Sequence, residues 1–413
     1  MKRPYYGWLV VGMSMISMMI VLGISFSSFG LFVVPVSQEL GLSRANMNSA
    51  LILLSVGGAV AAPAIGRLVD RVPMKPVMLL SAIGLGACFV GLGLSRSLWL
   101  DMAILLVPLP IVVQGAANMT MPVLIARWFE ARRGRAMALG MMGMAFGAAV
   151  LPPIVGFLIE REGWRMALVI SGCASTLILL VLFLFVHDRP APGEMTDVAG
   201  ARPGLSDVPS ASAHVYTIGE LLRMPHFWLI AVSAALCLCV TQGMQVSMVP
   251  LALDNGFDMV VGASLISAAG IGSFGGKLLL AIFADRINKE ALLAGLYTML
   301  ALLACLPLFS KAYPVLLTTA FAFGMGGSAM PVFYALLADR FGAASFGTVQ
   351  GLSMPFIALI GAASIRFAGE VYDKTGHYTL MFYAYCGIML LAAAMILSTR
   401  YVTRQRVTPA PAV

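Results

Sequence analysis

Twelve long apolar stretches divide this chain, and no other feature limits its fold so strongly. The chain has 413 residues, 60% of them hydrophobic and 11% charged, and its mean hydropathy is +0.94. A helix needs about 20 mostly apolar residues to cross the hydrocarbon core of a bilayer. The stretches lie near residues 8–34, 47–69, 76–95, 99–126, 136–158, 165–186, 226–250, 262–284, 291–310, 313–338, 345–369 and 378–399. Since they lack the apolar–polar alternation of barrel strands, we expect an all-α membrane protein with twelve transmembrane helices.

The distribution of lysine and arginine predicts the orientation of these helices. If both chain ends and the even-numbered connections lie inside, the inner side carries 18 of the 26 basic residues and the outer side carries six. The remaining two, Lys277 and Arg366, fall within spans. We therefore expect a multi-pass protein of the cell inner membrane with both termini in the cytoplasm. The net charge of +8 follows from this bias and does not suggest a nucleic-acid partner.

The sequence argues against an enzyme and against a bound cofactor or metal. The four histidines lie at span ends or in loops without metal-binding spacing, and the six cysteines lie in spans as small apolar residues. The glycine-rich stretches lie inside spans with no strand before them, so they do not match phosphate-binding loops. All 18 acidic residues fall in loops or at span ends, so the usual mid-membrane carboxylate that relays a proton is missing.

A polar connector divides the chain into two halves. Residues 187–216 are rich in Pro, Gly, Ser, Asp and Ala, a composition typical of flexible linkers. Helical periodicity resumes over 217–224 and predicts a short helix along the inner membrane surface. We therefore expect an N-terminal six-helix bundle over 1–186, a cytoplasmic linker over 187–224, and a C-terminal six-helix bundle with a short tail over 225–413.

The two halves repeat each other. Asp70-Arg71 follows the second span and Asp285-Arg286 follows the eighth, and a lysine comes shortly after each pair. Short inner loops could collect Asp-Arg pairs without any repetition, but the match in position favours a repeat. Repeated halves with a site between them are typical of secondary transporters.

Short motifs along almost the whole chain carry a family resemblance. They are Gly66-x-Leu68-x-Asp70-Arg71, Tyr6-Gly7-Trp8, Phe29-Gly30-Leu31-Phe32-x-x-Pro35 before Gly41-Leu42-Ser43-Arg44, Arg127-Trp128-Phe129 with Arg133-Gly134-Arg135-Ala136, and Tyr372-Asp373-x-x-Gly376-x-Tyr378. The first resembles the inner-loop motif of the major facilitator superfamily, with Pro73 where a glycine is usual. The others resemble the oxalate/formate antiporter and monocarboxylate transporter group within it. The resemblance implies the major facilitator fold, with two pseudo-symmetric six-helix bundles, and a carboxylate substrate.

One cation lies deep in the membrane. Lys277 occupies the middle of the eighth span, after a glycine-rich turn and before a run of leucines. A charge at this depth is costly and by default marks a functional site. We expect Lys277 to bind an anion, with Ser273 one turn earlier on the same helix face. The alternative is structural, in which Lys277 pairs with a carboxylate or extends to the membrane surface.

The family resemblance implies the same role for this residue. The resembled group typically has a Gly-Arg pair in the eighth span, whose arginine holds the substrate carboxylate, and Gly276-Lys277 stands in that place. Lysine offers a point charge where arginine offers a planar fork of donors. Proton-linked members often have an aspartate at the position of Ser273, so this departure weakens a proton-symport model.

Polar residues in other spans are candidates to line the same cavity. We expect Asn118 in the fourth span, Tyr334 in the tenth, Gln350 in the eleventh and Gln245 in the seventh to contact the substrate. For each residue, the alternative is a hydrogen bond between helices, which membrane proteins use routinely.

Arg366 in the eleventh span is a further candidate for substrate binding. The oxalate carriers of the resembled group use a second cation in that span. However, Arg366 lies about 160° around the helix from Gln350. The alternative is that Arg366 extends to the surface or pairs with Glu370 or Asp373.

Charged groups at the inner helix ends are candidates for gating. We expect Asp70 with Arg71, and Asp285 with Arg286, to hold the inner side closed through ion pairs and helix ends. Arg133 is a candidate partner for them.

The sequence as a whole predicts a secondary carrier of small organic carboxylates that works as a monomer in the lipid bilayer by alternating access. Anion exchange and proton-linked symport both stay open at this point. A transporter-like sensor that binds the anion without moving it is the alternative.

Overall fold

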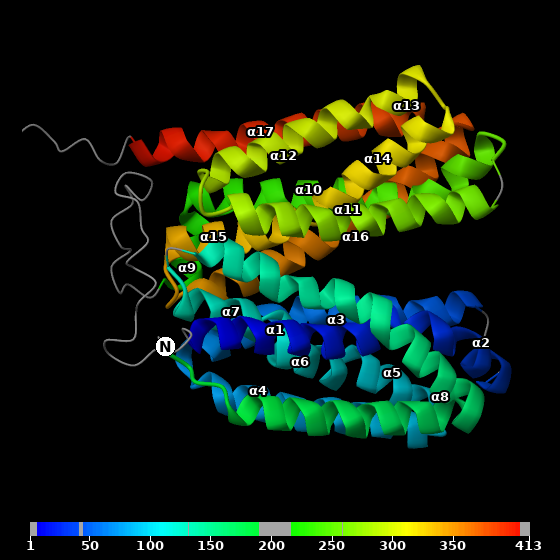
Figure 1. The fold of residues 1–413 in the computed structure, drawn as a ribbon, viewed down its shortest axis with the longest axis vertical. Helices are drawn as coiled ribbons and strands as arrows, with labels where there is room; N and C mark the ends of the chain where they lie inside the picture. The colour runs from blue at the N-terminus through cyan, green and yellow to red at the C-terminus, as the bar shows by residue number, and fades with distance from the viewer. Residues whose placement is uncertain (1–5, 41–43, 131, 190–215, 258, 405–413) are drawn as a thin grey trace, which may run out of the picture. The chain divides into compact units, whose positions relative to one another are not determined.

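The computed structural model describes residues 6–40, 44–130, 132–189, 216–257 and 259–404. Residues 190–215, which make up most of the predicted linker, lie outside the described residues. The chain forms two compact units, Met1–Val215 with Ala338–Pro355 and Tyr216–Leu337 with Phe356–Val413. Figure 1 shows the helices of both units, coloured along the chain.

The first unit is built from the helices of the first six predicted spans. They are α1 (Tyr6–Leu22), η1 (Gly23–Ser27), α2 (Phe29–Leu40), α3 (Arg44–Arg71), α4 (Met74–Leu94), α5 (Leu98–Leu106), α6 (Pro108–Val113), η2 (Gln114–Asn118), α7 (Thr120–Trp128) and α8 (Arg133–Leu184). The end of α15 (Ala329–Phe341) and the first part of α16 (Phe346–Thr375) also belong to this unit.

The second unit contains the remaining helices. They are α9 (Ile218–Arg223), α10 (Pro225–Asp254), α11 (Met259–Phe283), α12 (Lys289–Ala304), α13 (Leu306–Phe309), α14 (Tyr313–Gly326), most of α15, the rest of α16 and α17 (Thr379–Arg404). Local signals in the sequence set several of these starts. Thr217 and Glu220 form a capping box at α9, Pro225 begins α10, and the side chain of Asn288 caps α12.

Eleven helical stretches of the described residues are long and apolar enough to cross a membrane. The longest, Arg133–Leu184, has 52 residues, which as straight helix would be about 78 Å, more than twice the thickness of a hydrocarbon core. It folds back at Gly163, whose φ of 79° suits glycine (Figure 1). This stretch therefore supplies two crossings, and the twelve predicted spans and the all-α membrane fold class are confirmed within the described residues.

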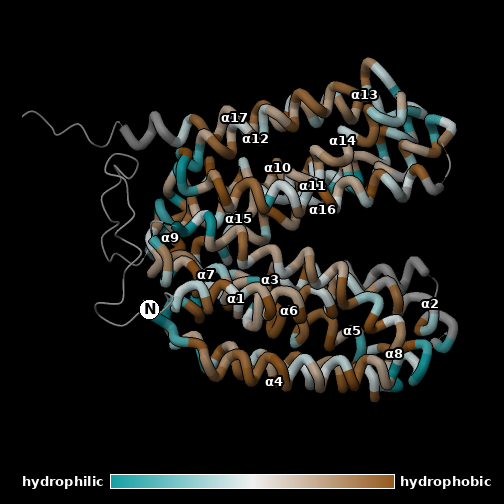
Figure 2. The backbone as a smooth tube through the Cα atoms, in the orientation of Figure 1, coloured by the Kyte–Doolittle hydropathy of each residue, from teal (hydrophilic) through white to brown (hydrophobic). Residues whose placement is uncertain are grey.

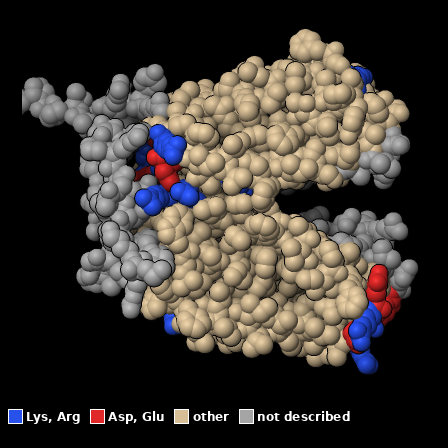
Figure 3. Space-filling view, viewed as in Figure 1, with Lys and Arg blue, Asp and Glu red and all other residues tan. Residues whose placement is uncertain are grey.

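The polarity of the helices fits a bilayer. Figure 2 shows hydrophobic residues along most of their length and hydrophilic residues mainly near their ends. On the face shown in Figure 3, the Lys, Arg, Asp and Glu side chains gather near helix ends, with a wide uncharged stretch between them. This is the arrangement that a charge-free hydrocarbon layer requires.

Four of the predicted spans are interrupted helices. The first span is divided into α1, η1 and α2, the fourth into α5, α6, η2 and α7, the ninth into α12 and α13, and the tenth into α14 and α15. In the fourth span, Pro108 and Pro110 lack the backbone N–H that a helix interior needs, so α5 ends before them. The segments η1 and η2 are π-helical turns, which often occur at functional sites.

Two of the sequence motifs pack together at the predicted inner end of the first unit. The ring of Tyr6 lies 5.1 Å from that of Trp128, and the ring of Trp8 lies 5.1 Å from that of Phe129. The guanidinium of Arg135 lies 5.5 Å from the centre of the Trp8 ring, within cation–π range. These motif residues therefore hold the ends of α1, α7 and α8 together.

Candidate functional site

Lys277 lies in α11 of the second unit, and only 3% of its surface is exposed. Its ammonium donates a hydrogen bond to Oγ of Ser273, one turn earlier, at 2.8 Å. The structure thus brings together the two residues that the sequence placed on one face of this helix.

Close packing of α11 against α14 sets the position of this pair. A Cβ on Gly272 would overlap the carbonyl oxygen of Phe321, and a Cβ on Gly276 would overlap Oγ of Ser328. Small residues allow such close approach of membrane helices. The Ser328 hydroxyl donates to the backbone carbonyl of Ser273 at 3.3 Å, which ties this turn of α11 to the break between α14 and α15.

The charge of Lys277 has no opposite partner in the described part of the chain. Its ammonium carries three donors, and one hydroxyl is the acceptor that the described residues supply. Removing a charge from water is costly unless an opposite charge and further hydrogen bonds compensate. An anion bound at Nζ would supply both.

Asn118 and Gln350 meet in the first unit. The side-chain amide of Gln350 donates to the backbone carbonyl of Asn118 at 3.1 Å, and the Asn118 amide donates to Oε1 of Gln114 at 2.9 Å. Gln114 in turn donates to the carbonyl of Gly58 at 3.0 Å, so the network joins η2 to α3 and α16. The Gln350 side chain thus makes the hydrogen bond between helices that was its alternative, whereas the Asn118 side chain bonds within its own segment and accepts the bond from Gln350 through its backbone carbonyl. Oε1 of the fully buried Gln350 has no partner among the described residues.

The other predicted substrate residues lie elsewhere in the second unit. Tyr334 is 2% exposed in α15, and Gln245 is exposed in α10. The side chain of Arg366 is 82% exposed, and its Nε donates to Oε1 of Glu370 at 2.7 Å, one turn later in α16. Arg366 thus makes the ion pair named as its alternative. In the described part of the chain, none of the three is hydrogen-bonded to Lys277, and their substrate roles stay predictions.

Asp70, at the end of α3, caps the start of α16. Its carboxylate accepts hydrogen bonds from the backbone N–H of Gly347 at 3.0 Å and from the N–H and hydroxyl of Thr348 at 2.6 and 2.7 Å. Free N–H groups and the helix dipole both favour an anion at a helix N-terminus. Gly66 makes the approach possible, since a Cβ there would overlap the Gly347 carbonyl.

Arg133 forms a second contact in the same unit. It makes an ion pair with Asp339 near the end of α15 and donates to the backbone carbonyls of Phe129 and Ala126 at 2.9 and 3.1 Å. Arg133 itself is buried. The end of α15 is thereby held against the ends of α7 and α8.

The remaining gating candidates are placed differently. Arg71 and Arg286 are exposed, and their side chains have no hydrogen-bond or ion-pair partner among the described residues. Asp285 is half-buried in the turn after α11. A gating role for these three stays a prediction.

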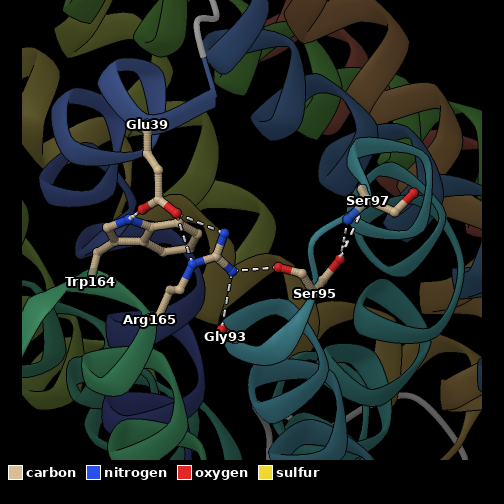
Figure 4. Close-up of polar contacts among 6 residues, drawn as sticks. All are labelled: Glu39, Gly93, Ser95, Ser97, Trp164 and Arg165. Carbon is tan, nitrogen blue, oxygen red and sulfur yellow. Dashed lines mark hydrogen bonds and ion pairs between the residues drawn. The ribbon is translucent and has the colours of Figure 1, made fainter.

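At the predicted outer end of the first unit, a polar cluster joins α2, α4 and α8 (Figure 4). Glu39 accepts hydrogen bonds from the indole N–H of Trp164 at 2.6 Å and from Nε of Arg165 at 3.0 Å. Arg165 also donates to the carbonyls of Gly93, at 3.3 Å, and Ser95. The hydrogen bond from Trp164, followed by that from Arg165, lowers the pKa of the Glu39 carboxyl from its ordinary value of 4.5.

Sequence reasoning missed several of these partners. Asp339 had a signal, because Asp339-Arg340 follows the tenth span where a basic loop follows the fourth. Gln114 lies one turn before Asn118 and could have been found as its helix neighbour. Thr348 and the Glu39–Arg165 pair carry no comparable signal, because their partners are distant in sequence.

Comparison with known proteins places the chain in a family. A model of the Major Facilitator Superfamily matches residues 15–357. Human monocarboxylate transporter 11 is 27% identical over 297 residues, which are 67% of this chain and 57% of that protein, so the chain spans little more than half of its length. An uncharacterised MFS-type transporter of Escherichia coli (strain K12), YhjX, is 26% identical over 328 residues, 77% of each protein. The crystal structure of the human organic anion transporter MFSD10 (TETRAN) has a TM-score of 0.71 at 18% identity, over 94% of this chain and 99% of that one, and it shows a shared fold.

Proposed function

Because the chain belongs to the major facilitator superfamily and is a membrane transporter, we propose that it carries small organic carboxylates by alternating access. The observation that carries the proposal is Lys277, a buried cation with no carboxylate partner in the described residues. The family membership also indicates that this chain is a transporter and not an enzyme.

Two features favour a carboxylate over other anions. Human monocarboxylate transporter 11, with which the chain shares 27% identity, bears that substrate class in its name, and the motifs of the chain resemble the same group. In addition, Nζ of Lys277 and Oγ of Ser273 lie 2.8 Å apart, so one carboxylate can accept from both of them. A single point charge suits a monocarboxylate or one end of a dicarboxylate.

Closure at the inner end is assigned to the contacts around α16 and α15. The cap that Asp70 gives to α16 and the ion pair of Arg133 with Asp339 support this assignment, because each joins helices from distant parts of the chain. The excess of Lys and Arg in the connections on one side supports cytoplasmic termini, in the inner membrane of a cell. One chain supplies all twelve spans, so a monomer is sufficient for this mechanism.

Exchange of one anion for another is the coupling mode that we assign. The sequence offers no mid-membrane Asp or Glu to carry a proton, and Ser273 occupies the place where proton-linked relatives often have an aspartate. A bound carboxylate can neutralise Lys277 in either direction of transport.

The test begins with purified protein in lipid vesicles and radiolabelled mono-, di- and aromatic carboxylates. Lys277→Ala should abolish uptake, or weaken the apparent affinity by at least about tenfold, because hydrogen bonds to charged groups contribute about 1.5–3 kcal/mol. Lys277→Arg should retain part of the uptake, since charge and reach persist. Lys311→Ala is the matched control, because it removes a lysine from an exposed connection of the same unit.

Two results would contradict the proposal. Wild-type uptake kinetics in Lys277→Ala would remove the site assignment. Saturable binding of a carboxylate to the wild-type protein without any uptake would instead indicate a sensor.

A further inference from the structure

The second unit has a groove between two consecutive helices that do not pack on each other. α11 packs on α14 and α10, whereas α12 packs mainly on α17. The space between α11 and α12 has a volume of about 450 Å³, within the 300–1,000 Å³ of typical ligand sites. Small residues widen it on both sides: Gly276 on α11, and Ala291 and Gly295 on α12. A Cβ added to Gly295 would meet no atom within 4 Å.

The lining of this groove is apolar. Leu279, Phe283 and Met299 are among its walls, and Ser328 is the one residue with a polar side chain in the lining. The Ser328 hydroxyl is already bonded to the Ser273 carbonyl. An anion such as the proposed substrate would therefore find no charged partner in the lining, and water would find few hydrogen bonds.

The position of the groove along α11 indicates which part of the membrane it would face. It runs from Gly276, at mid-span, to Ile287, in the turn that joins α11 to α12. The helical part of this wall, Gly276 to Phe283, measures about 10 Å, which is less than half of the roughly 30 Å hydrocarbon core. The groove therefore fits within one leaflet of the bilayer.

A cation lies in the turn beside the groove, next in sequence to one of its lining residues. Arg286 precedes the lining residue Ile287, is exposed, and has no side-chain partner among the described residues. A guanidinium is well suited to a phosphate. We propose that this groove binds one acyl chain of a phospholipid of the inner leaflet, whose phosphate is held by Arg286.

An acyl chain in the groove would have a structural consequence for the nearby Lys277–Ser273 site. The tip of the acyl chain would reach Gly276 and Ser328, the two residues that set the distance between α11 and α14 beside Ser273. The lipid would then keep α12 apart from α11 without contacting the substrate. The proposal is independent of which anion Lys277 binds.

Photolabelling in vesicles tests whether an acyl chain binds in the groove between α11 and α12. The protein is placed in vesicles that contain phosphatidylglycerol with a diazirine at the end of one acyl chain, and the labelled peptides are identified by mass spectrometry. Labelling should concentrate on residues 276–299. Gly295→Leu and Ala291→Leu fill the groove from α12 and should each lower this labelling severalfold. Gly387→Leu is the matched control, since Gly387 is an exposed glycine of α17 with nothing within 4 Å of an added Cβ.

The head-group assignment is tested with an acyl-matched diacylglycerol probe, which lacks the phosphate. Arg286→Gln should lower labelling by phosphatidylglycerol to the level of the diacylglycerol probe. Labelling spread evenly over all spans, or unchanged by both groove-filling variants, would contradict binding of the acyl chain in the groove. Labelling by phosphatidylglycerol that is unaffected by Arg286→Gln would overturn the role of Arg286. Each of these measurements is independent of transport, so the lipid-binding proposal would stand even if the proposed function failed.

Discussion

Two ionised side chains of this molecule are held in opposite ways. Lys277 is buried beside a single hydroxyl, and no opposite charge from the described residues is paired with it. Glu39 is exposed, yet it accepts hydrogen bonds from two side chains of α8, one of which, Arg165, carries the opposite charge. The first arrangement suits binding, and the second suits holding α2 in place.

The cluster around Glu39 should make stability depend on pH. Its folded-state pKa lies below 4.5, so its contribution is fully present above the unfolded-state pKa and is lost as the pH falls through the folded-state value. Glu39→Gln should therefore melt at a lower temperature than the wild type at neutral pH. The difference should persist down to about pH 5 and close at lower pH.

Thermal melting of the detergent-purified proteins over this pH range is the measurement. Glu162→Gln is the control, because Glu162 forms an exposed ion pair with Arg161 in the same turn, and such pairs contribute little. A difference between wild type and Glu39→Gln that did not change with pH would mean that the carboxylate charge is not what stabilises the cluster.

For single residues, the sequence predicts which charged side chains are unusual better than it predicts which residues they contact. Lys277 stands out because any cation in an apolar span is rare, and Ser273 follows from helical spacing. Thr348 cannot be found in this way, because its partner Asp70 is 278 positions away and no local pattern links them. For Arg366, a partner was visible in the sequence: Glu370 at i+4 forms an ion pair with it, which argues against a role of Arg366 in a cavity.

Among the helices, the breaks are what the sequence does not predict. Apolar content gives the position of a span, because any 20-residue apolar stretch satisfies a bilayer. It does not distinguish an unbroken helix from α5, α6, η2 and α7 in succession. The prolines at 108 and 110 were a usable signal for one break, whereas the π-helical turn at Gly23–Ser27 has no proline and depends on tertiary packing.

The start of α16 should control how firmly the inner end is closed. Asp70→Asn removes the charge that faces the N-terminus of α16 but leaves an oxygen that can still accept. A carboxylate charge at a helix N-terminus contributes about 0.3–2 kcal/mol, and its removal would shift an open–closed equilibrium by about 2- to 30-fold. Thr348→Val removes one of the three hydrogen bonds and should have a smaller effect.

The shift can be followed by thiol accessibility. Ser353 is fully buried in α16, so Ser353→Cys serves as the reporter in a background without the six native cysteines. Asp70→Asn should speed its reaction with an impermeant maleimide applied from the inner side. Equal labelling rates in the presence and absence of the substitution would show that Asp70 has no part in closure.

For the whole molecule, the bare charge of an empty site should govern coupling. If Lys277 binds the substrate as proposed, a bound carboxylate would neutralise it during transport, whereas an empty site would leave a buried, unpaired cation. Counter-substrate inside vesicles should therefore accelerate uptake more than an inward proton gradient does. Initial rates of radiolabel uptake under the two conditions decide this.

The opposite result is equally specific. If a proton gradient alone drove concentrative uptake into vesicles free of substrate, and a protonophore removed it, exchange would not be the main mode. The proton would then travel with the substrate as the neutral acid or on Lys277 itself.

The cap of Asp70 on α16 also has a consequence for the order in which contacts form during synthesis. Asp70 and Thr348 are 278 residues apart, and at about 5–20 residues per second a ribosome needs roughly 14–56 s to synthesise the chain between them. The third to tenth spans are synthesised during that interval, and throughout it Asp70 has no α16 N-terminus to cap and Gly66 has no Gly347 backbone beside it. The first unit must therefore persist in the membrane as an unfinished intermediate after its six spans are made, and these contacts form only once the start of α16 has been synthesised.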